Sequence, residues 1–159
     1  MNEEIDISKY ELSLRKAEWE DAFFLFILRN DTEVRKNSFH TETIAYEQHL
    51  NWYKNKIQDK NTQIYILQMN KKNIGQVRVD EENSNLIISY AICQEYRGKG
   101  YAKWMLGTLE KELRKVQSNN GKDLIGDVKK ENIGSQKIFL SLGYTESKMA
   151  YGFQYRKRI

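Results

Sequence analysis

One short segment of the chain combines glycines and basic side chains in a way that suits an anion. It reads E-Y-R-G-K-G-Y-A-K over residues 95–103, between a predicted strand and a predicted helix. The first amides of a helix have no partner within the helix, and together with the helix dipole they attract negative charge. Glycines let the backbone approach the anion closely. The segment predicts a pyrophosphate site, although an ordinary strand–helix turn with solvated basic residues has the same composition.

This segment matches neither of two well-known phosphate loops. The pattern GxxxxGK[ST] is absent from the chain. Gly98 and Gly100 are followed by Lys103, where the dinucleotide pattern GxGxxG requires a third glycine. No second parallel β-α-β unit follows, so neither a P-loop nor a dinucleotide fold is predicted.

The hydrophobic pattern places the segment in one α/β domain spanning residues 1–159. A mixed, mostly antiparallel sheet of six to seven strands is expected, flanked by about four helices. Residues 32–43 are expected to be irregular with one helical turn, and the apolar run 86–93 is expected to be buried on both faces. The predicted strands are 10–17, 63–69, 74–80, 86–93, 124–130, 144–148 and 150–158, and the predicted helices are 18–29, 44–57, 101–117 and 132–142.

Composition narrows the class of protein. The chain has 159 residues, 40% of them hydrophobic, which excludes a disordered chain. Its single cysteine, Cys93, allows no internal disulfide and favours a cytoplasmic location. The polar, acidic start does not resemble a secretory signal, and no apolar run is long enough to cross a bilayer. The histidines and the cysteine lack metal-site spacing, so no metal is expected.

The net charge of +4 is unevenly distributed. Residues 1–34 hold four basic and nine acidic side chains, so residues 35–159 carry a net charge of +9. This excess suits nucleic acid, a membrane or a phosphorylated small molecule. Because no nucleic-acid-binding motif is present, we expect neither nucleic acid nor membrane as partner.

Two motifs resemble those of the GNAT acetyltransferases. The run R-G-K-G-Y-A at 97–102 is similar to the family's [QR]-x-x-G-x-[GA] pyrophosphate loop. The run N-I-G-S-Q-K-I-F-L-S-L-G-Y at 132–144 resembles its N-x-x-A-x-x-x-Y-x-x-x-G-F segment. With the order of strands and helices, the resemblance covers residues 10–155. It implies direct transfer of an acetyl group from acetyl-CoA to an amine.

A second resemblance is confined to residues 28–52. The pattern L-R-N-D-x-x-V-R-K-N-S, followed by I-x-x-x-x-H-x-x-W, is similar to GNAT enzymes that act on nucleotide-linked amino sugars, the PseH type being the nearest. A related pattern occurs in ribosomal-protein N-terminal acetyltransferases of the Rim type. The amino-sugar resemblance implies that the acceptor is lined by Arg35, Asn37, His49 and Trp52.

The family resemblance also implies which residues hold acetyl-CoA. Backbone groups of Ala91, Ile92 and Cys93 would hold the pantetheine and the thioester carbonyl, and Asn132 would contact the pantetheine arm. The pyrophosphate would lie on amides of the loop and first helical turn, namely Arg97, Gly98, Lys99, Gly100, Tyr101, Ala102 and Lys103.

The proton donor of the family is missing from its usual position. Where the family motif has a tyrosine that protonates the leaving thiolate, this chain has Phe139, which has no proton to donate. Either CoA leaves as thiolate, or Tyr144, Tyr151 or Ser135 takes that role. Plain core packing also explains Phe139.

The acceptor ammonium must lose a proton before it attacks, and a carboxylate or histidine suits that step. The candidates are Asp80, Glu81, Glu82, His40 and His49, among which we select Glu81. Cys93 ends a buried strand and is expected to act as a small hydrophobe.

The leading prediction is an acetyl-CoA-dependent N-acetyltransferase, monomeric or homodimeric, that acts on a nucleotide-linked amino sugar such as a UDP-amino sugar. A protein N-terminus or another small amine is the alternative acceptor. Two other classes of protein remain open, namely a CoA-binding scaffold without catalysis and a basic nucleic-acid-binding module. The scaffold remains open because Phe139 stands where the family has its proton-donating tyrosine.

Overall fold

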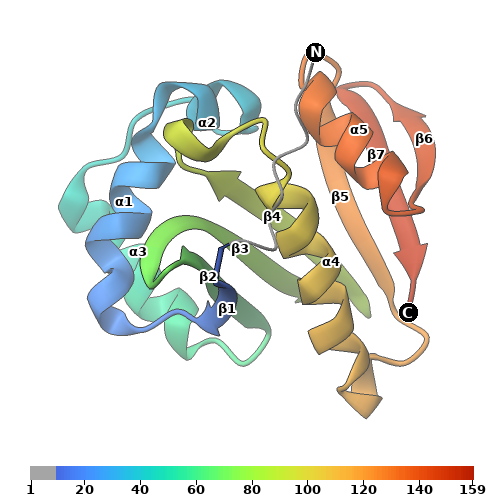
Figure 1. Ribbon diagram of the computed structural model, residues 1–159, viewed down its shortest axis with the longest axis horizontal. Helices are drawn as coiled ribbons and strands as arrows, with labels where there is room; N and C mark the ends of the chain where they lie inside the picture. The colour runs from blue at the N-terminus through green and yellow to red at the C-terminus, as the bar shows by residue number, and fades with distance from the viewer. Residues whose placement is uncertain (1–9) are drawn as a thin grey trace.

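A seven-stranded mixed sheet organises the protein in the computed structural model, which describes residues 10–159 (Figure 1). The first nine residues, which the prediction included in the domain, lie outside the described part. The strands are β1 (Leu12–Lys16), β2 (Thr62–Met69), β3 (Lys72–Glu82), β4 (Asn85–Ile92), β5 (Asp123–Lys129), β6 (Thr145–Met149) and β7 (Gly152–Arg158). The α-helices are α1 (Ala22–Asn30), α2 (Thr32–Asn37), α3 (Tyr46–Gln58), α4 (Tyr101–Arg114) and α5 (Ile133–Ser141).

The predicted fold class is confirmed, with differences at particular elements. The described chain has five α-helices, because the segment expected to be irregular contains α2. The side chain of Asp31 caps α2 by accepting from the amides of Glu33 and Val34. Helix α4 ends at Arg114, three residues before the predicted end, and a 3-10 turn over Gln117–Asn119 follows.

The sheet order is β1-β2-β3-β4-β5-β7-β6, and every pair is antiparallel except β4 with β5. Both hairpins around β3 turn through two residues with positive φ, Asn70–Lys71 and Asn83–Ser84. Such turns match the twist of the paired strands, and asparagine tolerates this conformation better than most residues. These turns set the register of the central strands.

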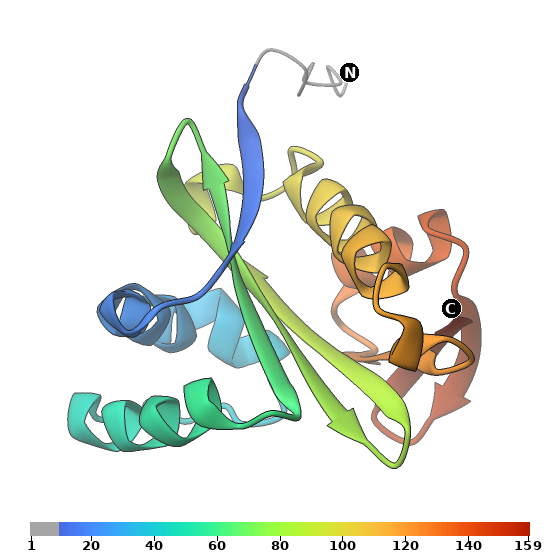
Figure 2. The same ribbon diagram turned by 90° about the horizontal axis from the view of Figure 1, so that it is seen from below.

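The helices cover the sheet on two sides (Figure 2). Helices α1 and α3 lie on one face and enclose a small core that includes Leu25, Tyr53 and Ile66. Helix α4 lies on the opposite face, over the main core with Met105 and Leu109. Helix α5 packs against the half of the sheet formed by β5 and β7.

The parallel pair in the middle of the sheet is short. Strand β4 pairs with β5 only from Asn85 to Ile87, whereas it pairs with β3 from Asn85 to Ile92. The two halves of the sheet therefore diverge beyond Ile87, and Figure 2 shows this divergence. The prediction that residues 86–93 are buried on both faces is wrong, because Ile87 and Ser89 are only partly buried where the strands separate.

Candidate active site

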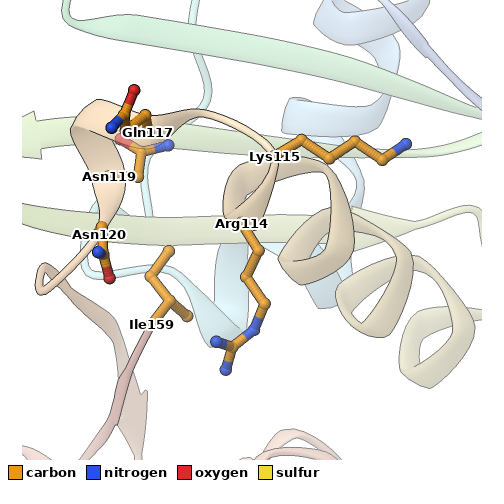
Figure 3. A pocket seen from close by; sticks show the side chains of 6 residues that line it. All are labelled: Arg114, Lys115, Gln117, Asn119, Asn120 and Ile159. Carbon is orange, nitrogen blue, oxygen red and sulfur yellow. The ribbon is translucent and has the colours of Figure 1, made fainter.

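A hollow of about 1050 Å³ lies where β4 and β5 separate, and we call it the central hollow. Side chains from β3, β4 and β5 line it, together with residues of all five helices. After the ligands expected from the sequence, we call the part formed by the 97–103 loop, α4 and α5 the donor side, and the part formed by α1, α2, α3 and β3 the acceptor side. A smaller hollow of about 390 Å³ lies far from the gap, at the end of α4 (Figure 3). Its lining includes Arg114, Asn119 and Ile159, and it contains none of the predicted site residues.

The donor side begins with a run of unpaired backbone amides. Gly98 and Gly100 adopt positive φ angles of 72° and 87°, and Gly100 caps the start of α4. The amides from Gly98 to Lys103 make no hydrogen bond to any other residue in the described part of the chain. Amides of this kind at a helix start bind phosphate oxygens. The predicted pyrophosphate residues from Gly98 to Lys103, including the exposed Lys99, therefore have amides available for a ligand.

Arg97 differs from the expectation because its groups are already bound within the protein. Its amide donates to the carbonyl of Gln94 at 3.3 Å. Its guanidinium donates from Nε to the carbonyl of Ile92 at 2.9 Å and from Nη2 to Oδ1 of Asp31 at 2.7 Å. Arg97 therefore connects the loop to the cap of α2 and thus joins the two sides of the site.

The backbone of β4 offers hydrogen-bonding groups to the gap at alternate residues. The amide of Cys93 donates to the carbonyl of Ile74, so the backbone groups of Cys93 and Ala91 face β3. The backbone groups of Ile92 and Tyr90 face the gap, where β5 no longer pairs with β4. Among the three predicted residues, Ile92 alone turns its backbone toward the gap. Burial raises the pKa of the Cys93 thiol, which fits an unreactive side chain.

At the start of α5, two predicted residues lie together with one that the sequence analysis missed. Asn132 and Ser135 line the central hollow, and Asn132 caps α5 by accepting from the Ser135 amide at 3.2 Å. The Ser135 hydroxyl is hydrogen-bonded to the hydroxyl of Tyr90 on β4. Burial raises the pKa of Tyr90, so this hydroxyl stays protonated at neutral pH. The pair of hydroxyl groups links β4 to α5.

Phe139 and Tyr144 have mainly packing roles in this structure. Phe139 is 1% exposed, stacks on Tyr155 at 5.2 Å, and covers Gly126 of β5 so closely that a side chain there would collide with its ring. Tyr144 is buried against Phe139 and is not part of the lining of the central hollow. Its position gives no contact through which it could protonate a thiolate in the gap.

Glu81 also lies away from the central hollow. It is near the end of β3, paired with Leu86 of β4, before the two halves of the sheet separate. Its carboxylate forms an ion pair with Lys122 at 2.6 Å. The selected general base is therefore not among the residues that line the central hollow.

Three of the four predicted acceptor residues lie together on the acceptor side. Asn37, His49 and Trp52 line the central hollow. Arg35 does not, because its guanidinium donates to the carbonyls of Asn30 at 3.1 Å and Thr41 at 3.2 Å. It holds the segment that follows α2 in place.

His49 is 1% exposed and lies among the rings of Phe26, Trp52 and Tyr53. Its Nε2 donates to the carbonyl of Ala22 at 3.1 Å, which leaves Nδ1 as an acceptor. Nδ1 is buried and has no hydrogen-bond partner among the described residues. Burial lowers the pKa of His49, and the charge of Arg29 lowers it further, so the ring is neutral at pH 7.

A carboxylate that the sequence analysis did not select faces the gap from β5. Asp127 lies two residues beyond Ile125, the last residue of β5 that pairs with β4, and it lines the central hollow. Tyr151 donates a hydrogen bond to its Oδ1, and Gln154 donates to the same oxygen at 3.1 Å. Burial and the bond to Asp127 raise the pKa of Tyr151 to about 12. These donors fix the carboxylate and leave Oδ2 without a protein partner in the described residues.

Arg29 and Arg78 are the other residues that sequence reasoning missed. Strand alternation contains a signal for Arg78, because it lies between Val77 and Val79 in the predicted strand 74–80 and must point to the opposite face from these two residues. Arg29 is part of the L-R-N-D motif. Asp127 lies in a predicted strand, but where that strand separates from β4 depends on pairing between distant segments.

The family is established by comparison with known sequences. The family model described as "Acetyltransferase (GNAT) domain" matches residues 11–145. Because this match covers most of the chain, the protein belongs to the GNAT acetyltransferase family. It is an N-acetyltransferase of this type, and its acetyl donor is acetyl-CoA, which fits the unpaired amides of the loop. No curated protein matches the chain.

Solved structures show the same fold at low sequence identity. A domain from Methanocaldococcus jannaschii DSM 2661 aligns with a TM-score of 0.82 and 21% identity, covering 94% of this chain and 99% of that one. RimL, a ribosomal L7/L12 alpha-N-protein acetyltransferase solved with CoA, aligns with a TM-score of 0.80 and 16% identity, covering 93% of this chain and 94% of that one. Spermidine N-acetyltransferase from Vibrio cholerae, solved with CoA and spermine, aligns with a TM-score of 0.75 and 21% identity. This alignment covers 93% of this chain and 94% of that one.

No three His, Cys, Asp or Glu side chains within residues 10–159 are grouped to hold a metal ion. No helix in the same range is long and apolar enough to span a membrane.

Proposed function

We propose that the protein transfers the acetyl group of acetyl-CoA directly to the primary amine of a nucleotide-linked amino sugar. The observation that carries this proposal is the central hollow, which joins two different surfaces at the gap between β4 and β5. Loop amides on the donor side suit a pyrophosphate, whereas polar and aromatic side chains on the acceptor side suit a sugar or a base. Holding both reactants at the gap lowers the barrier through positioning.

We infer that Asp127 removes the proton from the acceptor ammonium. Asp127 lines the hollow, its Oδ2 has no protein partner in the described residues, and Tyr151 and Gln154 hold the carboxylate in place. Once the nitrogen is neutral, its lone pair attacks the thioester carbonyl carbon, the carbon–sulfur bond breaks, and the electron pair stays on sulfur. The proton remains on Asp127 and then passes to solvent.

The hydroxyl pair of Tyr90 and Ser135 is the proposed hydrogen-bond donor to the departing sulfur. Both residues line the hollow, and one of the two hydroxyl protons is free when the other forms the bond between them. Phe139 cannot serve, since it has no donor. A free CoA thiol has a pKa near that of an ordinary thiol, so a hydrogen bond rather than full proton transfer is sufficient at neutral pH.

The amino-sugar acceptor draws support from the grouping of Asn37, His49 and Trp52 in one hollow. A protein N-terminus and a polyamine are the competing acceptors, which correspond to the names of RimL and the spermidine acetyltransferase. A thiol-release assay with acetyl-CoA and UDP-amino sugars, N-terminal peptides and spermidine tests the choice. We expect release with a UDP-amino sugar, and release with spermidine or peptide alone would overturn the acceptor assignment.

Donor binding is tested separately by thermal unfolding. Acetyl-CoA must raise the melting temperature, because a ligand that binds the native state stabilises it. An unchanged melting temperature at saturating acetyl-CoA would contradict the donor site. A melting shift without thiol release from any amine would favour a CoA-binding scaffold.

A further inference from the structure

Two arginines face one tryptophan on the acceptor side of the central hollow. The guanidinium carbon of Arg29 lies 5.1 Å from the ring centre of Trp52, and that of Arg78 lies 5.2 Å from it. All three side chains line the hollow, and they come from α1, β3 and α3. Stacking on an aromatic ring fixes a guanidinium while its edge stays available for a ligand.

These two positive charges are poorly neutralised by the protein. Arg29 forms no ion pair within the described residues, and its Nη1 is buried without a hydrogen-bond partner there. Burial lowers the pKa of Arg29, and the charge of Arg78 lowers it further. Holding two positive charges close together in a partly buried site costs free energy unless an anion neutralises them.

Arg78 has a partner, but that partner is shared. Its Nε donates to Oδ2 of Asp80 at 2.7 Å, and Oδ1 of the same carboxylate accepts from Lys56 at 3.1 Å and from Thr62 at 2.7 Å. Asp80 thus balances only one of two cations, and the Nη groups of Arg78 have no protein acceptor in the described chain. The acids that line the hollow are Glu33 on α2 and Asp127 on β5.

His49 adds an unsatisfied acceptor beside these donors. Its buried Nδ1 has no partner among the described residues, and its ring lies 5.7 Å from that of Trp52. A ligand that satisfies this part of the site must supply negative charge to the arginines. It must also supply a hydroxyl or N–H group to His49.

We propose that Arg29 and Arg78 form a binding subsite for a diphosphate or a similarly spaced pair of anionic groups on the acceptor substrate. His49 receives a hydrogen bond from a neighbouring hydroxyl of that substrate. The inference rests on the proposed acetyl transfer and narrows its acceptor to anionic amines. It excludes spermidine and other polyamines as preferred acceptors, because their ammonium groups would be repelled by both guanidinium groups.

The test is binding of UDP and of inorganic diphosphate, measured by calorimetry with the CoA site already saturated. We expect UDP to bind to the CoA complex, and the variants Arg29→Gln and Arg78→Gln each to weaken UDP at least about tenfold while CoA affinity stays unchanged. Arg114→Gln, at an exposed arginine at the end of α4, is the matched control and should leave UDP affinity unchanged. Arg29→Lys and Arg78→Lys should fall between glutamine and wild type, because lysine keeps the charge but not the planar fork.

Each outcome decides a different point. Failure of UDP and diphosphate to bind the CoA complex overturns the anion subsite, as does binding that the glutamine variants leave intact. If UDP binds only when CoA is absent and is displaced by CoA, it occupies the donor loop. That result also overturns the proposed subsite. Binding of diphosphate alone, without a gain from the nucleoside in UDP, supports the subsite and limits recognition to the anion. If CoA itself does not bind, the proposed function fails, yet UDP binding still tests the subsite independently.

Discussion

The two sides of the central hollow present different kinds of groups to their proposed ligands. The donor side presents backbone amides of one continuous segment, residues 98–103, shaped by two glycines with positive φ. The acceptor side presents side chains from α1, α3 and β3, which are distant in the sequence. A backbone site binds the same group in every sequence that can adopt its loop, whereas a side-chain site changes with each substitution. RimL and the spermidine N-acetyltransferase were both solved with CoA, although their names give different acceptors, and this difference between a backbone site and a side-chain site fits that pattern.

The donor side depends on backbone shape, and Gly100→Val is expected to break it. Valine strongly disfavours the φ of 87° at this cap, so the loop amides lose their common direction. Since several charge-assisted hydrogen bonds are lost together, CoA affinity measured by calorimetry should fall at least about 100-fold. Gly121→Val is the control, because Gly121 has a similar φ of 85° but no neighbour within 4 Å and no place in the hollow. Equal loss of CoA binding in both variants would show a general folding defect.

Asp127→Asn tests whether β5 supplies the proton acceptor at the gap. We expect kcat to fall about 100-fold or more, because general base catalysis contributes at least that factor, while CoA affinity is retained. Glu81→Gln makes the same carboxylate-to-amide change outside the hollow, at the Lys122 ion pair. Steady-state rates of the two variants decide whether Asp127 or Glu81 is the general base. The reverse order of effects would return the general base to Glu81.

Tyr90→Phe tests the hydroxyl pair that links β4 to α5 at the gap. Losing one hydrogen bond to the departing thiolate should lower kcat by about tenfold, with little change in the KM for acetyl-CoA. Tyr144→Phe serves as the comparison, since Tyr144 lies outside the hollow. Unaltered turnover in Tyr90→Phe would show that CoA leaves without help from this pair.

The link between the two sides is the Arg97–Asp31 ion pair, and it predicts a pH effect on stability. Burial acts to raise the pKa of Asp31, but hydrogen bonds from Arg97 and from the Val34 amide outweigh it and lower the pKa below 3.8. The pair's stabilisation is therefore complete above the unfolded-state pKa and is lost as pH falls through the lower native value. Asp31→Asn should unfold about 1 kcal/mol more easily at pH 7.

The sign of that effect can be checked by chemical denaturation. The difference in unfolding free energy between wild type and Asp31→Asn should shrink as pH falls below about 4. A difference that grows toward acid pH, or is absent at pH 7, would show that the pair does not join the two sides energetically.

Local signals in the sequence predict most of the fold and the donor loop. Hydrophobic spacing locates the main strands and helices, and glycines between a strand and a helix locate the loop with the unpaired amides. The end of α4 was overestimated because Val116 continues the apolar spacing, although it lies beyond the helix and is exposed. Helix α2 is predicted only as one helical turn within residues 32–43, because its six residues carry little apolar pattern and the helix depends on the Asp31 cap.

The acceptor side could be predicted only in part. His49 and Trp52 share a helix at a spacing of three, so one motif found both. Asp127 and Arg78 become site residues only because β4 separates from β5 and because β3 exposes that face, and both facts depend on pairing across the sheet. Glu81 was selected for its place at a strand end, but the register puts it before the gap.

The most direct test of the account compares one amine with and without an anionic group. The measurement is kcat/KM for a free amino sugar and for the same sugar linked to UDP, with wild type and Arg78→Gln. The account predicts a preference of wild type for the UDP-linked form of at least about tenfold, and a clear loss of that preference in Arg78→Gln. Equal kcat/KM values for the two sugars in wild type, or a preference that survives in Arg78→Gln, would contradict it.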